Sequence, residues 1–192
     1  MKKTIIYVAL AGLLTSYGCS SDTKTAAEKA NEKKIDSQSG AISDDAKADA
    51  KEVAKAMVEL TSMGMTELEM SRLAVQNAAN PQVKGYALQV MTKHQQDERE
   101  LRNLASQLTL TLPAGLSDDG KDRLEDLKKQ TGTAFDLEYL KEMADVNDQA
   151  ADIAEDLEDN APNDAVKKLA EKLLADDRSH RDQAKQLRNV LD

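Results

Sequence analysis

Apolar residues recur at every third or fourth position through four long segments of this chain, and this spacing limits the fold more than any other feature. Such spacing places the apolar side chains along one face of an α-helix. Only three prolines and eight glycines occur among the 192 residues, so few positions would interrupt long helices. No segment shows the alternation of apolar and polar residues that is typical of a half-buried strand. We therefore predict an all-α protein.

Capping residues mark the predicted limits of the first two long helices. Ser43 precedes two aspartates and is expected to cap the first helix, because a serine oxygen accepts a hydrogen bond from a free backbone N–H group. Asn80 and Pro81 end that helix and begin the second, with Asn80 as the cap and Pro81 at the first helical position. The second helix is expected to continue to about Leu108.

The remaining helices are predicted from similar signals. Pro113 interrupts the apolar pattern, and a short helix is expected to follow Ser117. Thr133 is predicted to cap the third long helix, with Asp136 completing an approximate capping box. Pro162 is expected to begin the fourth long helix. Four long helices with mostly short connections predict an antiparallel four-helix bundle, with the short extra helix in the longest connection.

The N-terminal residues 1–18 are predicted to be a signal peptide. Lys2 and Lys3 precede an apolar run of residues 5–14, which is too short to span a membrane comfortably. The single cysteine of the chain, Cys19, follows this run. The arrangement resembles a bacterial lipoprotein signal, which implies that Cys19 becomes the lipidated first residue. The alternative is an ordinary signal peptide that is cut nearby.

Residues 19–43 are polar and nearly free of large apolar side chains. A segment of this composition buries too little surface to offset its ordering entropy, so we predict a flexible tether that links the lipid to a helical domain at 44–192. Ser20 follows the cysteine, and the resemblance to Gram-negative lipoproteins then favours the outer membrane. The predicted location is therefore the cell envelope, with the domain facing the periplasm.

Charge and cysteine content exclude several classes of function. The formal net charge is −9, which argues against general binding to nucleic acid, because that binding requires clustered lysine and arginine. With its one cysteine at position 19, the predicted domain has no thiol for a disulfide or for nucleophilic catalysis. The sequence also has no nucleophile-elbow pattern, His-Glu-x-x-His motif or phosphate-binding loop, so a hydrolase is not favoured.

Each of the four predicted long helices carries one polar residue on or beside its apolar face: Glu67, His94, Asn147 and His180. Asp177 lies three residues before His180 and therefore shares its helix face. This Asp-x-x-His spacing is similar to the Glu-x-x-His motif of di-iron bundles. Glu67, His94, Asp177 and His180 are thus candidate metal ligands, and Asn147 is a candidate polar partner in the core, since an amide binds first-row metals poorly. The alternative is that these residues only form hydrogen bonds with one another.

Four stretches of the sequence resemble one bacterial family, the domain of unknown function 4142. They read GMTELEMSRLAVQNAANPQVKGYALQVMTKH, LPAGLS, FDLEYLKEM and LADDRSHRDQAKQL. The resemblance implies an envelope protein with a ferritin-like bundle, and it implies no particular reaction. Members of that family usually have a histidine at the position of Asn147, so this chain lacks one of three candidate imidazoles.

Two hypotheses of function follow from these features. The first is a non-enzymatic envelope lipoprotein, held at the membrane by its lipid, that binds a protein partner or contributes to stress tolerance. The second is a ferritin-like protein that binds iron, manganese or zinc through the candidate ligands. The sequence favours the first hypothesis, because its candidate ligands are fewer than a complete di-iron site requires.

Overall fold

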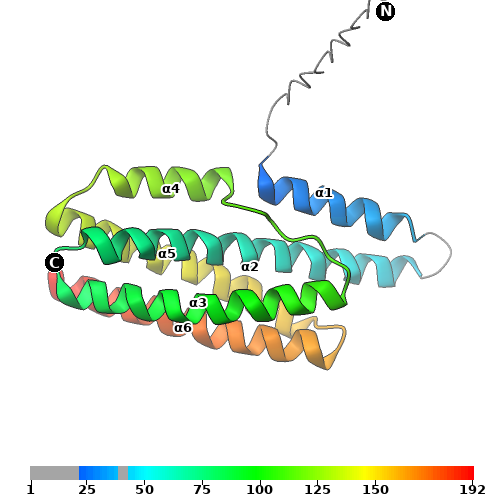
Figure 1. Ribbon diagram of the computed structural model, residues 1–192. Helices are drawn as coiled ribbons and strands as arrows, with labels where there is room; N and C mark the ends of the chain where they lie inside the picture. The colour runs from blue at the N-terminus through cyan, green and yellow to red at the C-terminus, as the bar shows by residue number, and fades with distance from the viewer. Residues whose placement is uncertain (1–21, 39–42) are drawn as a thin grey trace, which may run out of the picture.

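The computed structural model describes residues 22–38 and 43–192, and helices occupy most of these residues (Figure 1). The helices are α1 (Thr23–Asp36), α2 (Asp44–Asn77), α3 (Pro81–Gln107), α4 (Asp118–Lys128), α5 (Gly132–Asp159) and α6 (Asp164–Leu191). The described ranges contain no β-strand, which confirms the predicted all-α class. The predicted signal peptide and Cys19 lie outside the described residues. Within the described ranges, no helix combines the length and apolar character that a membrane span requires.

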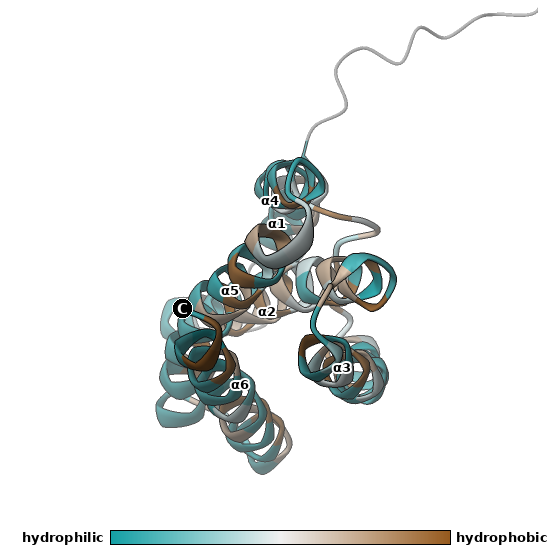
Figure 2. Cartoon of the chain, turned by 90° about the vertical axis from the view of Figure 1, so that its left-hand side faces the viewer, coloured by the Kyte–Doolittle hydropathy of each residue, from teal (hydrophilic) through white to brown (hydrophobic). Residues whose placement is uncertain are grey.

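The four long helices pack in a ring. Helix α2 contacts α3 and α5, and α6 contacts the same two helices from the other side. Helices α1 and α4 lie along one side of this ring, where both contact α2 and where α4 also contacts α5 (Figure 1). Apolar and hydrophilic positions occur together on the same helices, as expected for amphipathic helices that bury one face (Figure 2).

The apolar core consists of two clusters separated by a polar layer. One cluster lies where α2 contributes Met57 and Leu60, and the other lies where α2 contributes Met70 and Ala74. The same division occurs on the other three long helices. The buried residues with an ionisable or amide side chain that lie between the two clusters along the four helices are Glu67, His94, Asp97, Asn147, Asp177 and His180. The polar layer therefore crosses the bundle at about the middle of each long helix.

Three of the predicted helix starts are confirmed. The Ser43 side chain accepts a hydrogen bond from the backbone N–H of Ala46 at 3.2 Å. Asn80 caps α3 with Pro81 at the first helical position. Ser117 caps α4 through the N–H of Gly120 at 3.1 Å. These local contacts need only nearby residues, so sequence alone is enough to locate them.

Two predicted starts are wrong by one or two residues. Helix α5 has Thr131 rather than Thr133 as its cap, and Thr131 makes no capping hydrogen bond with its side chain. Asp136 does not form a capping box. Its carboxylate instead accepts the backbone N–H groups of Ala79 at 2.9 Å and Asn80 at 2.7 Å, which ties the start of α5 to the turn between α2 and α3. Helix α6 is capped by Asn163, one residue after the predicted Pro162.

The predicted flexible tether is wrong for residues 23–36, which form α1. Three residues spaced four apart, Ala27, Asn31 and Ile35, are buried against the rest of the molecule. The Asn31 amide donates to the Thr111 carbonyl at 2.9 Å and accepts from the Thr111 N–H at 2.7 Å. Polar pairing with a distant loop thus compensates for the small apolar face, and this contribution is invisible in the local sequence.

Candidate metal centre

Three of the predicted ligands meet in the polar layer from three different helices. Glu67 lies on α2, His94 on α3 and His180 on α6, and their exposed fractions are 1%, 7% and 3%. Each offers one potential ligand atom, and these atoms all lie within 4.8 Å of one another. The packing of α2, α3 and α6 therefore brings together residues that are up to 113 positions apart in the chain (67 to 180).

Glu67 and His94 form a buried pair. The His94 Nε2 atom lies 3.0 Å from the Glu67 Oε2 atom, and the carboxylate accepts the hydrogen bond. Burial lowers the pKa of His94, but the charge of Glu67 and its hydrogen bond outweigh burial and raise the pKa to about 9. Without a metal, the two side chains therefore form an ion pair at neutral pH.

His180 lies beside this pair but differs from His94 in its charge. The ring centroids of His94 and His180 are 5.4 Å apart. Burial lowers the pKa of His180, and the charged His94 lowers it further. The Nδ1 atom of His180 is buried and has no hydrogen-bond partner among the described residues. A neutral imidazole with a buried, unpartnered nitrogen is the form of histidine that binds a metal ion.

Asp177, the fourth predicted ligand, is buried near the group but is not part of it. Burial raises the pKa of Asp177, and the nearby charge of Glu67 raises it further. Asp97 is also buried on the neighbouring α3, where it forms an ion pair with Lys172. The structure therefore brings together three of the four predicted ligands and leaves Asp177 at the edge of the group.

Asn147 is completely buried on α5. Its Nδ2 atom donates to the Met143 carbonyl at 2.7 Å, whereas its Oδ1 atom has no hydrogen-bond partner among the described residues. The amide nitrogen thus bonds to a carbonyl of its own helix, and the amide oxygen remains an acceptor without a donor in the core. Buried acceptors without a hydrogen-bond partner are rare in proteins, so the Asn147 Oδ1 atom is an unusual group in the polar layer.

Two buried tyrosines form hydrogen bonds near the group, and the sequence patterns did not predict them. The Tyr86 hydroxyl donates to the His180 carbonyl at 3.0 Å, and the Tyr139 hydroxyl pairs with Ser71 at 2.9 Å. Burial raises the pKa of both tyrosines, so both hydroxyls stay neutral. Tyr86 lies eight residues before His94, which places it on the same helix face, and this spacing could have identified it.

The donor set fits a first-row transition metal. Two imidazoles and one carboxylate are ligands that zinc, iron, manganese and copper accept. Ligand atoms about 2.0–2.2 Å from a metal lie about 3–3.5 Å from one another, and the three candidate atoms here lie within 4.8 Å of one another. A set of three protein ligands leaves one coordination position open.

Residues 25–187 match the family described as Domain of unknown function (DUF4142), which covers most of the chain. The chain belongs to the DUF4142 family. This result confirms the family resemblance that the sequence suggested. The match begins inside α1, so the family domain includes most of this helix.

Solved structures share the fold of this DUF4142 protein. CopM in its Cu(II)-bound form is 20% identical, with a TM-score of 0.63 over 71% of this chain and 95% of CopM. CopM in a Ag-bound form has a TM-score of 0.58 at the same identity, over 70% of this chain and 93% of that one. A conserved hypothetical protein, rv2844, from Mycobacterium tuberculosis is 12% identical, with a TM-score of 0.59 over 73% and 93% of the two chains. No curated protein matches the chain significantly.

Proposed function

We propose that this protein binds a transition-metal ion in the polar layer of its helical bundle. The observation that carries the proposal is the meeting of Glu67, His94 and His180 from three helices, with one imidazole nitrogen left without a hydrogen bond. Burying so many ionisable groups is costly unless they are paired or bind an ion. A bound cation would be compensated by the Glu67 charge and would occupy the free nitrogen of His180.

The donor set narrows the choice of metal. Imidazole suits zinc, copper, iron and nickel, and divalent copper binds a given nitrogen and oxygen site more tightly than the other first-row ions. The structural relative CopM has been solved in Cu(II)-bound and Cu(I)-bound forms, which supports including copper with iron, manganese and zinc as candidates. The proposal does not require a reaction, and we propose a binding rather than an enzymatic role.

The proposal for cellular location follows from the N-terminal sequence. We propose that residues 1–18 are a signal peptide and that Cys19 carries a lipid, which holds the domain at the outer membrane on its periplasmic side. We further propose that α2, α3, α5 and α6 form a ferritin-like four-helix bundle. We also propose that its macromolecular partner is a protein of the envelope rather than a nucleic acid. The acidic composition supports the exclusion of nucleic acid.

Metal titration of the purified protein tests the function. We expect about one Cu²⁺ or Zn²⁺ ion per chain. We expect Glu67→Gln and His180→Gln each to weaken binding by at least about tenfold to a hundredfold, since loss of a residue that only supports a ligand already costs that much. Glu69→Gln is the matched control, since Glu69 lies on the same helix but pairs with Arg72 at the surface. Failure of the wild-type protein to bind any of the four metals, or an equal loss in the control, would contradict the proposal.

A further inference from the structure

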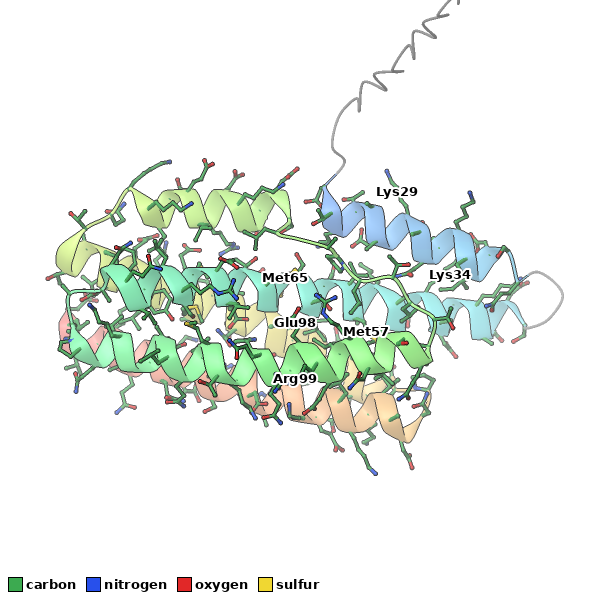
Figure 3. The ribbon with its side chains drawn as sticks, in the orientation of Figure 1. Lys29, Lys34, Met57, Met65, Glu98 and Arg99 are labelled. Carbon is green, nitrogen blue, oxygen red and sulfur yellow. The ribbon has the colours of Figure 1, made fainter. Side chains whose placement is uncertain are left out.

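A small cavity leads to the candidate metal site between α2 and α3. Its volume is about 30 Å³, which is room for about one or two water molecules. Glu67, His94 and Asp177 line it and are buried, whereas Met65 and Glu98 line it and are half-exposed. Figure 3 shows Met65 and Glu98 where α2 and α3 run side by side. The cavity therefore extends from the metal ligands toward the surface.

The lining of the cavity favours a cation. Among the described residues, its ionisable side chains are carboxylates and His94, with no lysine or arginine in the lining. Three of these four carboxylates are already paired: Glu67 with His94, Asp97 with Lys172, and Glu98 with Arg102. Asp177 is buried and makes no hydrogen bond or ion pair within the described part of the chain. A buried carboxylate without a partner, beside a thioether and an imidazole, is a group that would attract a metal cation.

Gly64 lines this cavity beside His94. It lies inside α2 with an ordinary helical backbone, so the backbone does not require glycine there. A Cβ atom at Gly64 would lie 3.4 Å from the His94 Nδ1 atom and 4.0 Å from the Cε1 atom, which is ordinary contact. Glycine inside a helix is destabilising relative to alanine. The chain thus keeps a destabilising residue where a methyl group would fit but would occupy space against His94.

We propose that this cavity is the path by which the metal cation reaches its site, with Asp177 as the carboxylate that first receives the cation and Gly64 as the residue that keeps the path open. The inference rests on the proposed function and adds to it a path for the entering metal and roles for Asp177 and Gly64. It separates the role of Asp177 from that of the three ligands, because Asp177 lines the path without joining the group of three.

The uptake rate of Co²⁺ by the full-length protein tests the role of Gly64, with the visible absorption of bound Co²⁺ as the readout. We expect Gly64→Ala to slow uptake by about tenfold while its equilibrium affinity stays within about twofold of wild type. Gly85→Ala is the matched control, since Gly85 lies inside α3 with nothing within 4 Å of its Cβ position. Both variants should be more stable than wild type, so slower uptake by Gly64→Ala cannot result from misfolding.

If Gly64→Ala takes up Co²⁺ at the wild-type rate, or if Gly85→Ala is slowed equally, the cavity is not the entry path of the metal. Absence of binding of Co²⁺, copper, zinc, iron and manganese by the wild-type protein would instead overturn the proposed function itself. The two failures are therefore distinguishable in one set of measurements.

A second pair of variants tests Asp177. We expect Asp177→Asn to slow Co²⁺ uptake by about tenfold, because the neutral amide is a poorer metal ligand than the carboxyl group of Asp177. Asp176→Asn removes a charge from the neighbouring position, which does not line the cavity, and should retain the wild-type rate. A normal uptake rate in Asp177→Asn would overturn the role of Asp177. An unchanged rate with faster release would make it a permanent ligand and would also overturn that role.

Discussion

His94 and His180 are the same side chain in the same polar layer, but their neighbours give them opposite charge behaviour. His94 is next to the Glu67 carboxylate, which raises its pKa to about 9 despite burial. His180 has no such partner, so burial lowers its pKa. A single carboxylate thus decides which imidazole holds a proton and which is free for a metal at neutral pH.

Replacing Glu67 with glutamine should reverse the behaviour of His94. Because Glu67 is the main cause that raises the pKa, Glu67→Gln leaves burial dominant, and the pKa should fall from about 9 to below the ordinary 6.5. NMR titration of metal-free protein measures this, and a His180→Gln background leaves His94 as the only histidine. A His94 pKa that stays near 9 in Glu67→Gln would show that another group holds the proton.

The same shift has a consequence for stability. The folded pKa of His94 is raised, so its contribution is fully present below about pH 6.5 and is lost as the pH rises through about 9. A shift of this size corresponds to roughly 3 kcal/mol. Denaturant unfolding of the metal-free protein at several pH values should therefore show a larger loss between pH 6.5 and 9 in wild type than in Glu67→Gln. Identical pH profiles for the two proteins would contradict this account.

At the scale of whole elements, α4 packs on α2 through a close approach that requires glycine. A Cβ atom at Gly120 would lie 2.4 Å from the Thr66 Oγ1 atom, which is far shorter than any normal contact. Thr66 cannot move freely, because its hydroxyl donates to the Ser62 carbonyl at 3.0 Å. The beginning of α4 therefore depends on the absence of a side chain at position 120.

We predict that Gly120→Ala destabilises the protein by about 1–3 kcal/mol, the usual cost of overpacking. The reason is that the methyl group must push α4 away from α2 or displace Thr66. Denaturant unfolding measures the loss, and Thr66→Ala should restore part of it, since it removes the oxygen atom that would clash. No recovery in the double variant would mean that the strain lies elsewhere.

For the molecule as a whole, the candidate site joins three helices that are far apart in the chain. Helices α2, α3 and α6 each contribute one candidate ligand, so a bound metal would favour the folded state over the unfolded chain. The two apolar clusters on either side of the polar layer hold the helices in place without the metal. The metal would thus add stability to a fold that already exists.

We predict that Zn²⁺ at about 100 times its dissociation constant stabilises the protein by about 2.7 kcal/mol, which raises the melting temperature by roughly 5–10 °C. The gain should fall to about 1.4 kcal/mol or less in Glu67→Gln and remain in full in Glu69→Gln. Metal affinity should fall by about tenfold for each pH unit below the His94 pKa of about 9, because a proton competes for the same nitrogen. A melting temperature that Zn²⁺ leaves unchanged, or an affinity independent of pH, would contradict this prediction.

The sequence by itself determined the helical class, several helix starts and the family, because periodicity, caps and prolines act over a few neighbouring residues. It also identified Glu67, His94 and His180 as polar residues on apolar faces. Only the tertiary structure decided that these three side chains meet while Asp177 lines a cavity beside them, and that Thr23–Asp36 forms α1 through Asn31 and Thr111. Such outcomes depend on how helices distant in sequence pack and rotate against one another, and local patterns contain no record of that arrangement.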